Sequence, residues 1–81
     1  MAKFEIPKFR YIAQDFIGHI YCYIKKPGLM KNYNGFVSYG EFINIGDGKE
    51  NPNWRDTLID LETDDYDFEN GILRRIEPLL N

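Results

Sequence analysis

Residues 8–25 restrict the fold more than any other segment, because their sequence predicts two β-strands joined by one tight turn. Asp15 and Gly18 define the turn. Aspartate favours the first position of a type I turn, and glycine at the fourth can adopt the left-handed conformation that closes a short hairpin loop with a bulge. This turn places Asp15 opposite His19 and fixes the register. The predicted cross-strand pairs are Ala13 with Tyr21, Ile12 with Cys22, Tyr11 with Tyr23, and Arg10 with Ile24.

The register also predicts the two faces of this hairpin, because side chains alternate between the faces of a strand. One face is mostly aliphatic and the other mostly aromatic, so neither is plainly polar. We therefore expect one of them to lie under further strands. The first face carries Ile12, Ile20, Cys22 and Ile24 with Gln14 and Arg10, and the second carries Phe9, Tyr11, Ala13, Tyr21 and Tyr23.

The rest of the chain predicts more short strands and one ambiguous segment. Residues 36–39 and 41–45 have strand-like patterns, and the glycine- and asparagine-rich residues 46–53 form the strongest loop by composition. In residues 54–61 the apolar side chains have helical spacing, so a short helix or helical turn is favoured over a strand. Asn70 and Gly71, between two apolar alternations, predict a second hairpin.

These elements predict one small domain spanning residues 1–81, all-β or β-rich α+β. We expect five or six short antiparallel strands in a curled sheet or partial barrel, with at most one short helix near residues 54–61. The predicted core consists of Ile12, Ile20, Ile24, Phe42, Ile43 or Ile45, Trp54, Leu58 and Leu73.

Composition limits the classes of protein to consider. The single cysteine of this 81-residue chain cannot form an internal disulfide, so the domain does not depend on disulfides as small secreted domains do. No apolar run approaches the roughly 18 to 20 residues that a membrane span requires. The amino-terminal sequence MAKFEIPKF lacks the apolar core of a signal peptide. A cytoplasmic protein without a membrane partner is expected.

Candidate catalytic and metal sites are weak. His19 is the only histidine, and no nucleophile is placed beside it by the sequence. Cys22 has no neighbouring cation to lower its pKa, and one histidine and one cysteine cannot supply the usual zinc ligands. Asp47 and Glu50 lack the full ligand pattern of a calcium loop. We expect no catalytic residue, no metal and no cofactor.

Two surfaces are candidates for binding. The chain has a formal net charge of −3, with +4 on residues 1–32 and −7 on residues 33–81. The acidic half can contact a cationic groove of another protein, as a mimic of a nucleic-acid backbone. Aromatic side chains with basic neighbours can instead stack single-stranded nucleic acid. The acidic candidates are Asp56, Asp60, Glu62, Asp64, Asp65, Asp67 and Glu69, and the aromatic and basic candidates are Phe9, Arg10, Tyr11, Tyr21, Tyr23 and Lys25.

The spacing of several motifs over residues 9–76 resembles that of small proteins encoded by tailed bacteriophages and prophages. The motifs are Tyr11-Ile12-Ala13-x-Asp15-x-x-Gly18-x-x-Tyr21, Lys26-Pro27, Gly40-x-Phe42-Ile43, Trp54-x-Asp56-Thr57-Leu58-Ile59 and Asn70-Gly71-x-Leu73.

The resemblance brings no catalytic residue with it, but it implies a setting in the cytoplasm of an infected bacterium. There the expected function is a non-enzymatic protein, a monomer or weak homo-oligomer, that binds and inhibits a host protein or defence complex of the anti-CRISPR or anti-restriction type. A single-stranded nucleic-acid-binding module and a phage structural or assembly component are the alternatives.

Overall fold

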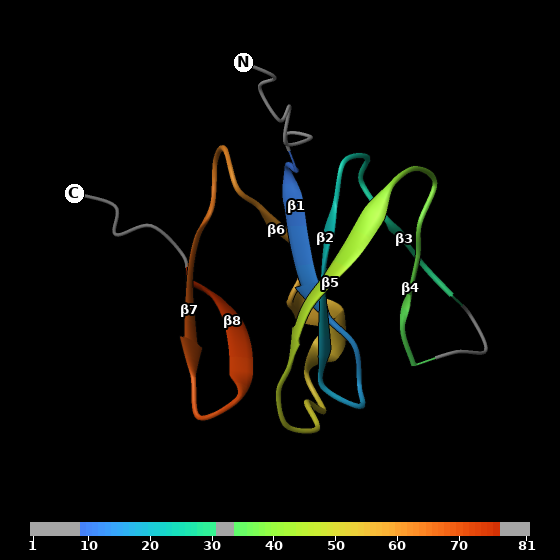
Figure 1. The fold of residues 1–81 in the computed structure, drawn as a ribbon. Helices are drawn as coiled ribbons and strands as arrows, with labels where there is room; N and C mark the ends of the chain where they lie inside the picture. Colours follow the sequence, from blue (N-terminus) through green and yellow to red (C-terminus); the bar gives the residue numbers. More distant parts are fainter. Residues whose placement is uncertain (1–8, 31–33, 77–81) are drawn as a thin grey trace, which may run out of the picture.

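The computed structural model of the chain describes residues 9–30 and 34–76 (Figure 1). Five strands have four to six residues and three have two residues. In chain order the elements are β1 (Tyr11–Gln14), β2 (His19–Tyr23), β3 (Gly28–Leu29), β4 (Phe36–Val37), β5 (Phe42–Asp47), the 3₁₀ turn η1 (Trp54–Asp56), β6 (Ile59–Asp60), β7 (Asp65–Glu69) and β8 (Ile72–Ile76).

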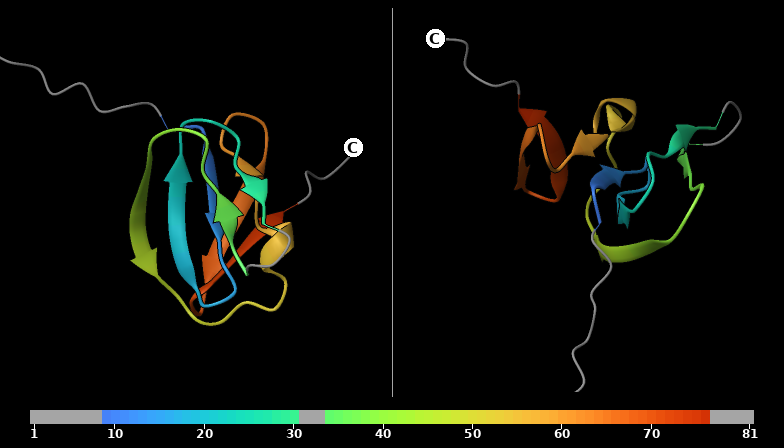
Figure 2. Two further views of the ribbon diagram at one scale, coloured as in Figure 1. Left: turned by 90° about the vertical axis from the view of Figure 1, so that its right-hand side faces the viewer. Right: turned by 90° about the horizontal axis from the view of Figure 1, so that it is seen from above.

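A four-stranded antiparallel sheet with the order β5-β2-β1-β6 forms the centre of the fold. Two small hairpins flank it: β7–β8 lies on one side and β3–β4 on the other, as both views show (Figures 1 and 2). The sheets do not close into a barrel. The predicted small antiparallel β-rich fold with at most one short helix is confirmed.

The opening hairpin has the predicted turn and register. Pairs run from Tyr11 with Tyr23 to Gln14 with Ile20, and stop one short of the predicted pair of Arg10 with Ile24. In the turn, the Asp15 carboxylate accepts the backbone N–H groups of Gly18 at 2.8 Å and His19 at 2.9 Å. Gly18 has φ of 114°, the left-handed region that glycine tolerates. Lys8, the first residue of the predicted hairpin, lies outside the described residues.

The second hairpin is also confirmed. Glu69 pairs with Ile72 across a two-residue loop. The φ angles of Asn70 and Gly71 are 55° and 80°, as a type I′ turn requires at both central positions. Strand β4 ends at Val37, short of the predicted residue 39, and β5 continues to Asp47, into the predicted loop.

The helical turn predicted over residues 54–61 is limited to η1, after which the chain enters β6. Thr57 Oγ1 lies 2.7 Å from Trp54 O and 3.0 Å from Gln14 O, so its one O–H can donate to either carbonyl, and it accepts the Gln14 N–H. These bonds tie the end of the turn to β1. Ile59 then pairs with Ile12 in the sheet, which a continued helix would prevent.

The core is smaller than predicted. Ile12, Ile20, Trp54 and Leu73 are buried as predicted, and Leu58 and Ile24 are half-buried. Phe42, and Ile43 or Ile45, were predicted to be buried, but all three are exposed, by 56%, 49% and 53%. The reason is topological: β5 is the edge strand of the described sheet, where β2 is its one neighbouring strand.

Gln14 joins the flanking β7–β8 hairpin to the sheet. Its side chain is fully buried, and its Nε2 donates to Gly18 O and Gly71 O, both at 2.9 Å. Its Oε1 accepts the Leu73 N–H at 2.9 Å and the Asn51 amide at 3.0 Å. One polar side chain therefore connects β1, the first turn, the loop after β5 and β8. No sequence pattern indicated this role.

Candidate protein-binding surface

Arginines neutralise part of the predicted acidic surface. Arg10 makes a two-point contact with Asp60, at 3.1 and 2.9 Å, and its Nε lies 3.7 Å from Glu62. Arg74 makes the same kind of contact with Asp67, at 3.1 and 2.8 Å. The hydrogen bond from Arg10 lowers the pKa of Asp60 and raises that of Arg10. The charge of these carboxylates is therefore matched locally.

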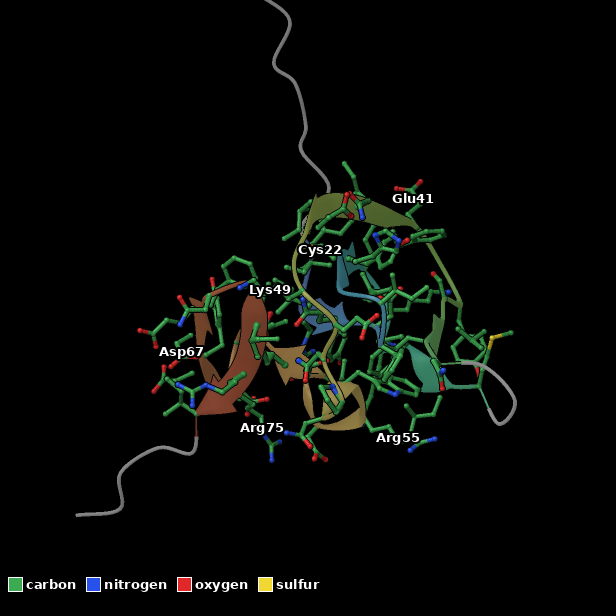
Figure 3. All side chains as sticks on the ribbon, turned by 90° about the horizontal axis from the view of Figure 1, so that it is seen from below. Cys22, Glu41, Lys49, Arg55, Asp67 and Arg75 are labelled. Carbon is green, nitrogen blue, oxygen red and sulfur yellow. The ribbon has the colours of Figure 1, made fainter. Side chains whose placement is uncertain are left out.

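The other acidic candidates lie in two places, around a polar hollow beside β6 and along β7. Asp64 accepts the Asp60 N–H at 2.9 Å, which stabilises the turn after β6. It lines a polar hollow with Asp56 and Asp60, but Lys26, Arg55 and Arg75 line the same hollow. Asp67 lies on the outer side of the β7–β8 hairpin, well separated from Arg55 (Figure 3). Exposed Asp65 and Glu69 are on β7 with it.

The predicted aromatic and basic surface is divided as well. Tyr23 is buried, and desolvation raises its pKa, so its ring is not available for stacking. The rings of Tyr21 and Phe42 pack near it, with centroids 6.3 and 6.1 Å from that of Tyr23. Tyr11 has Arg10 over its ring at 5.4 Å, next to the acidic residues. Phe9 is half-buried and Lys25 exposed.

The candidate catalytic residues have structural contacts. His19 Nδ1 lies 2.6 Å from Asp47 Oδ1 and links the ends of β2 and β5. This hydrogen bond raises the pKa of His19 and lowers that of Asp47. Cys22 packs against the buried side chains of Ile12, Ile20, Ile59 and Leu73, and burial raises the pKa of its thiol. Within residues 9–30 and 34–76, no group of three potential metal-ligating side chains converges.

The surface that the sequence did not predict lies along β5. Its exposed Phe42, Ile43 and Ile45 are apolar side chains from both faces of one edge strand. On one face, a hollow of about 300 Å³, here called the isoleucine groove, separates β5 from the β7–β8 hairpin. The isoleucine groove is lined by Ile12, Ile20, Ile45, Tyr66, Phe68 and Leu73, with Gly46 and Asp47 at its end.

A second hollow lies on the opposite face of β5, toward the β3–β4 hairpin. It has a volume of about 760 Å³ and is here called the tyrosine groove. Asp15 also lines this groove, so its apolar surface has one carboxylate beside it. The main apolar residues of the tyrosine groove are Ile17, Tyr21, Tyr23, Met30, Phe36 and Phe42.

The signal for this surface was present in the sequence. A half-buried strand alternates apolar with polar residues, but Phe42, Ile43 and Ile45 place apolar side chains on both faces. That pattern led to the prediction that these side chains are buried, as they would be in a strand covered on both faces. In the structure both faces of β5 open onto grooves instead. Exposed apolar surface of this kind is typical of interaction sites.

Among the described residues, no helix combines the length and apolar character needed to cross a membrane. No protein-family model matches the sequence, and no curated protein or solved structure is significantly similar to it.

Proposed function

We propose that this protein is a non-enzymatic binding protein that attaches to another protein through β5 and its two grooves. The observation that carries the proposal is the exposure of Phe42, Ile43 and Ile45 on an edge strand. Folded monomers rarely leave a large contiguous apolar surface in water unless it serves an interaction. Aromatic and aliphatic side chains around grooves are also the usual anchors of protein interfaces.

The resemblance to small phage proteins supplies the setting for this proposal. In that setting, the protein acts in the cytoplasm of an infected bacterium and inhibits a host protein or defence complex by occupying its surface. The acidic residues then form the rim of the interface and not its centre. Carboxylates already paired with Arg10 and Arg74 contribute less to a long-range field than unpaired ones.

The test is an affinity capture from nuclease-treated bacterial lysate with wild-type protein, Ile45→Ser and Ile76→Ser. Ile45 and Ile76 are 53% and 41% exposed, so the two variants change the same residue type at similar exposure. Ile76 is on β8 and does not line either groove. We expect a host protein that wild type and Ile76→Ser retain and Ile45→Ser loses.

A variant with fewer carboxylates distinguishes binding through the acidic residues from binding through β5 and its grooves. It carries Asp56→Asn, Asp65→Asn and Glu69→Gln, all at exposed positions. Loss of the captured protein with this variant, and full retention with Ile45→Ser, would contradict the proposal and favour the acidic surface. Capture of nucleic acid alone, before nuclease treatment, would instead favour the single-strand-binding alternative.

A further inference from the structure

In the part of the chain that the structure describes, one side of β5 has no neighbouring strand, and it presents backbone groups as well as apolar side chains. The Ile24 N–H donates to Glu41 O at 3.1 Å, so the backbone of Glu41 points toward β2. Backbone groups alternate in direction along an antiparallel strand. The N–H and C=O groups of Phe42 and Asn44 therefore point away from β2, to the side where the described sheet has no further strand.

We infer that the partner contributes an extended segment that adds to the sheet as a strand beside β5. This inference rests on the proposed function and names the form of the partner. A strand added there lies about 4.8 Å from β5 and sends alternate side chains to opposite faces of the sheet. The isoleucine groove lies on one of those faces and the tyrosine groove on the other. Backbone pairing gives affinity in such complexes, and side-chain grooves give specificity.

Charge indicates the sequence of that segment. Glu41 directly precedes β5 and Asp47 ends it. Both are exposed, and the Asp47 carboxylate is also hydrogen-bonded to His19. Glu41 extends outward beside β5, away from the body of the domain (Figure 3). Opposite charges on neighbouring strands stabilise pairing, and like charges destabilise it. Because both grooves are mainly apolar, the partner segment accordingly has apolar residues at successive positions in its middle, with lysine or arginine at each end.

The same charges disfavour a second copy of this chain as the occupant. Two identical edges related by a two-fold axis pair antiparallel. The Glu41 end of one β5 then meets the Asp47 end of the other, which places carboxylates together twice.

The test uses a displayed library of random nonapeptides selected against wild-type protein, Asn44→Pro and Asn44→Thr. Proline at residue 44 removes an outward N–H without touching the ladder to β2, a position where strands tolerate proline. Threonine keeps the N–H and is the matched control. We expect wild type and Asn44→Thr to enrich peptides with an apolar middle and basic ends, and Asn44→Pro to enrich none.

The best peptide is then synthesised with and without N-methyl groups on alternate amides. N-methylation removes backbone donors and retains every side chain, so we expect binding to weaken at least tenfold in one of the two methylation frames. Replacing the terminal basic residues by glutamate should weaken it by a similar factor. Equal binding of all versions would overturn the inference.

Three further outcomes separate this inference from the proposed function. A lysate protein that Asn44→Pro captures as well as wild type, and Ile45→Ser loses, would overturn strand addition and leave the proposed function standing. Self-association that Asn44→Pro abolishes, seen by sedimentation, would assign the edge to a second copy. Tighter peptide binding after deletion of residues 1–8 would instead assign the edge of β5 to that segment as its occupant. Circular dichroism spectra and thermal unfolding of each variant verify that it is folded.

Discussion

Replacing Gln14 with leucine should remove much of the stability of the fold. The Gln14 side chain makes four hydrogen bonds of 2.9 to 3.0 Å. Each bond contributes about 1 kcal/mol net, and a buried group left without its partner costs about 1–3 kcal/mol. Leucine removes all four bonds and leaves the Leu73 N–H without its acceptor, whereas Gly18 O and Gly71 O keep the N–H groups of Gly48 and Lys49. The free energy of unfolding should therefore fall by about 4 kcal/mol.

That loss is large for a chain of this size. An 81-residue domain has a total stability of roughly 4–12 kcal/mol. Each kcal/mol shifts the melting temperature of such a small domain by about 4–8 °C, so Gln14→Leu should melt about 15 °C or more below wild type. Urea unfolding followed by the fluorescence of Trp54, the single tryptophan and a buried one, measures the change.

Two variants make the test specific. Asn53→Leu makes a similar polar-to-apolar change at an exposed position and should stay within about 0.5 kcal/mol of wild type. Gln14→Glu keeps the shape of the side chain but buries a carboxyl group, whose pKa in the folded state burial raises. Its stability relative to wild type should be greatest below about pH 4.3 and fall as pH rises through that raised pKa. A Gln14→Leu protein within about 1 kcal/mol of wild type would refute the hydrogen-bond account.

Three other changes test local features. Because Asp47 raises the pKa of His19, the contribution of their ion pair to stability is complete below the unfolded-state pKa, about 6.5, and disappears as pH rises through the folded-state pKa. Asp47→Asn should lower the His19 pKa toward 6.5, measured by NMR titration of the imidazole. Gly48→Ala should unfold the protein at lower urea concentration, because an added Cβ would collide with Gly71 O. Asn70→Val should cost about 1–2 kcal/mol in thermal unfolding, since φ of 55° disfavours β-branched residues, whereas Asn70→Gly should be tolerated.

The sequence predicted both longer hairpins because their turns are local. Asp15 with Gly18, and Asn70 with Gly71, contain the information that sets each register within a few residues. The edge position of β5 depends on which strand lies beside which, and no residue of β5 encodes that. The same limit applied to Gln14, whose partners Gly71 and Leu73 are 57 and 59 residues away.

The sequence indicated which types of residue could bind a partner, but not whether those residues form one open surface. Seven carboxylates in fourteen residues predicted an acidic face, yet Arg10 reaches Asp60 across 50 residues of sequence. Likewise, the four aromatic residues predicted to share one face of the hairpin were candidates for stacking, but Tyr23 is buried. Charge pairing and burial are both non-local, so composition could not decide between an open patch and a neutralised one.

The attachment of the β7–β8 hairpin has a consequence for hydrogen exchange. Its ladder is entirely local, and the bonds that hold it to the rest of the molecule centre on Gln14 and on the Lys49 N–H to Gly71 O bond. Such a unit can open without global unfolding. Amide protons of β7 should then exchange faster than those of β1 and β2. Because Tyr66 and Phe68 form one wall of the isoleucine groove, a ligand bound there should slow the exchange of this hairpin most.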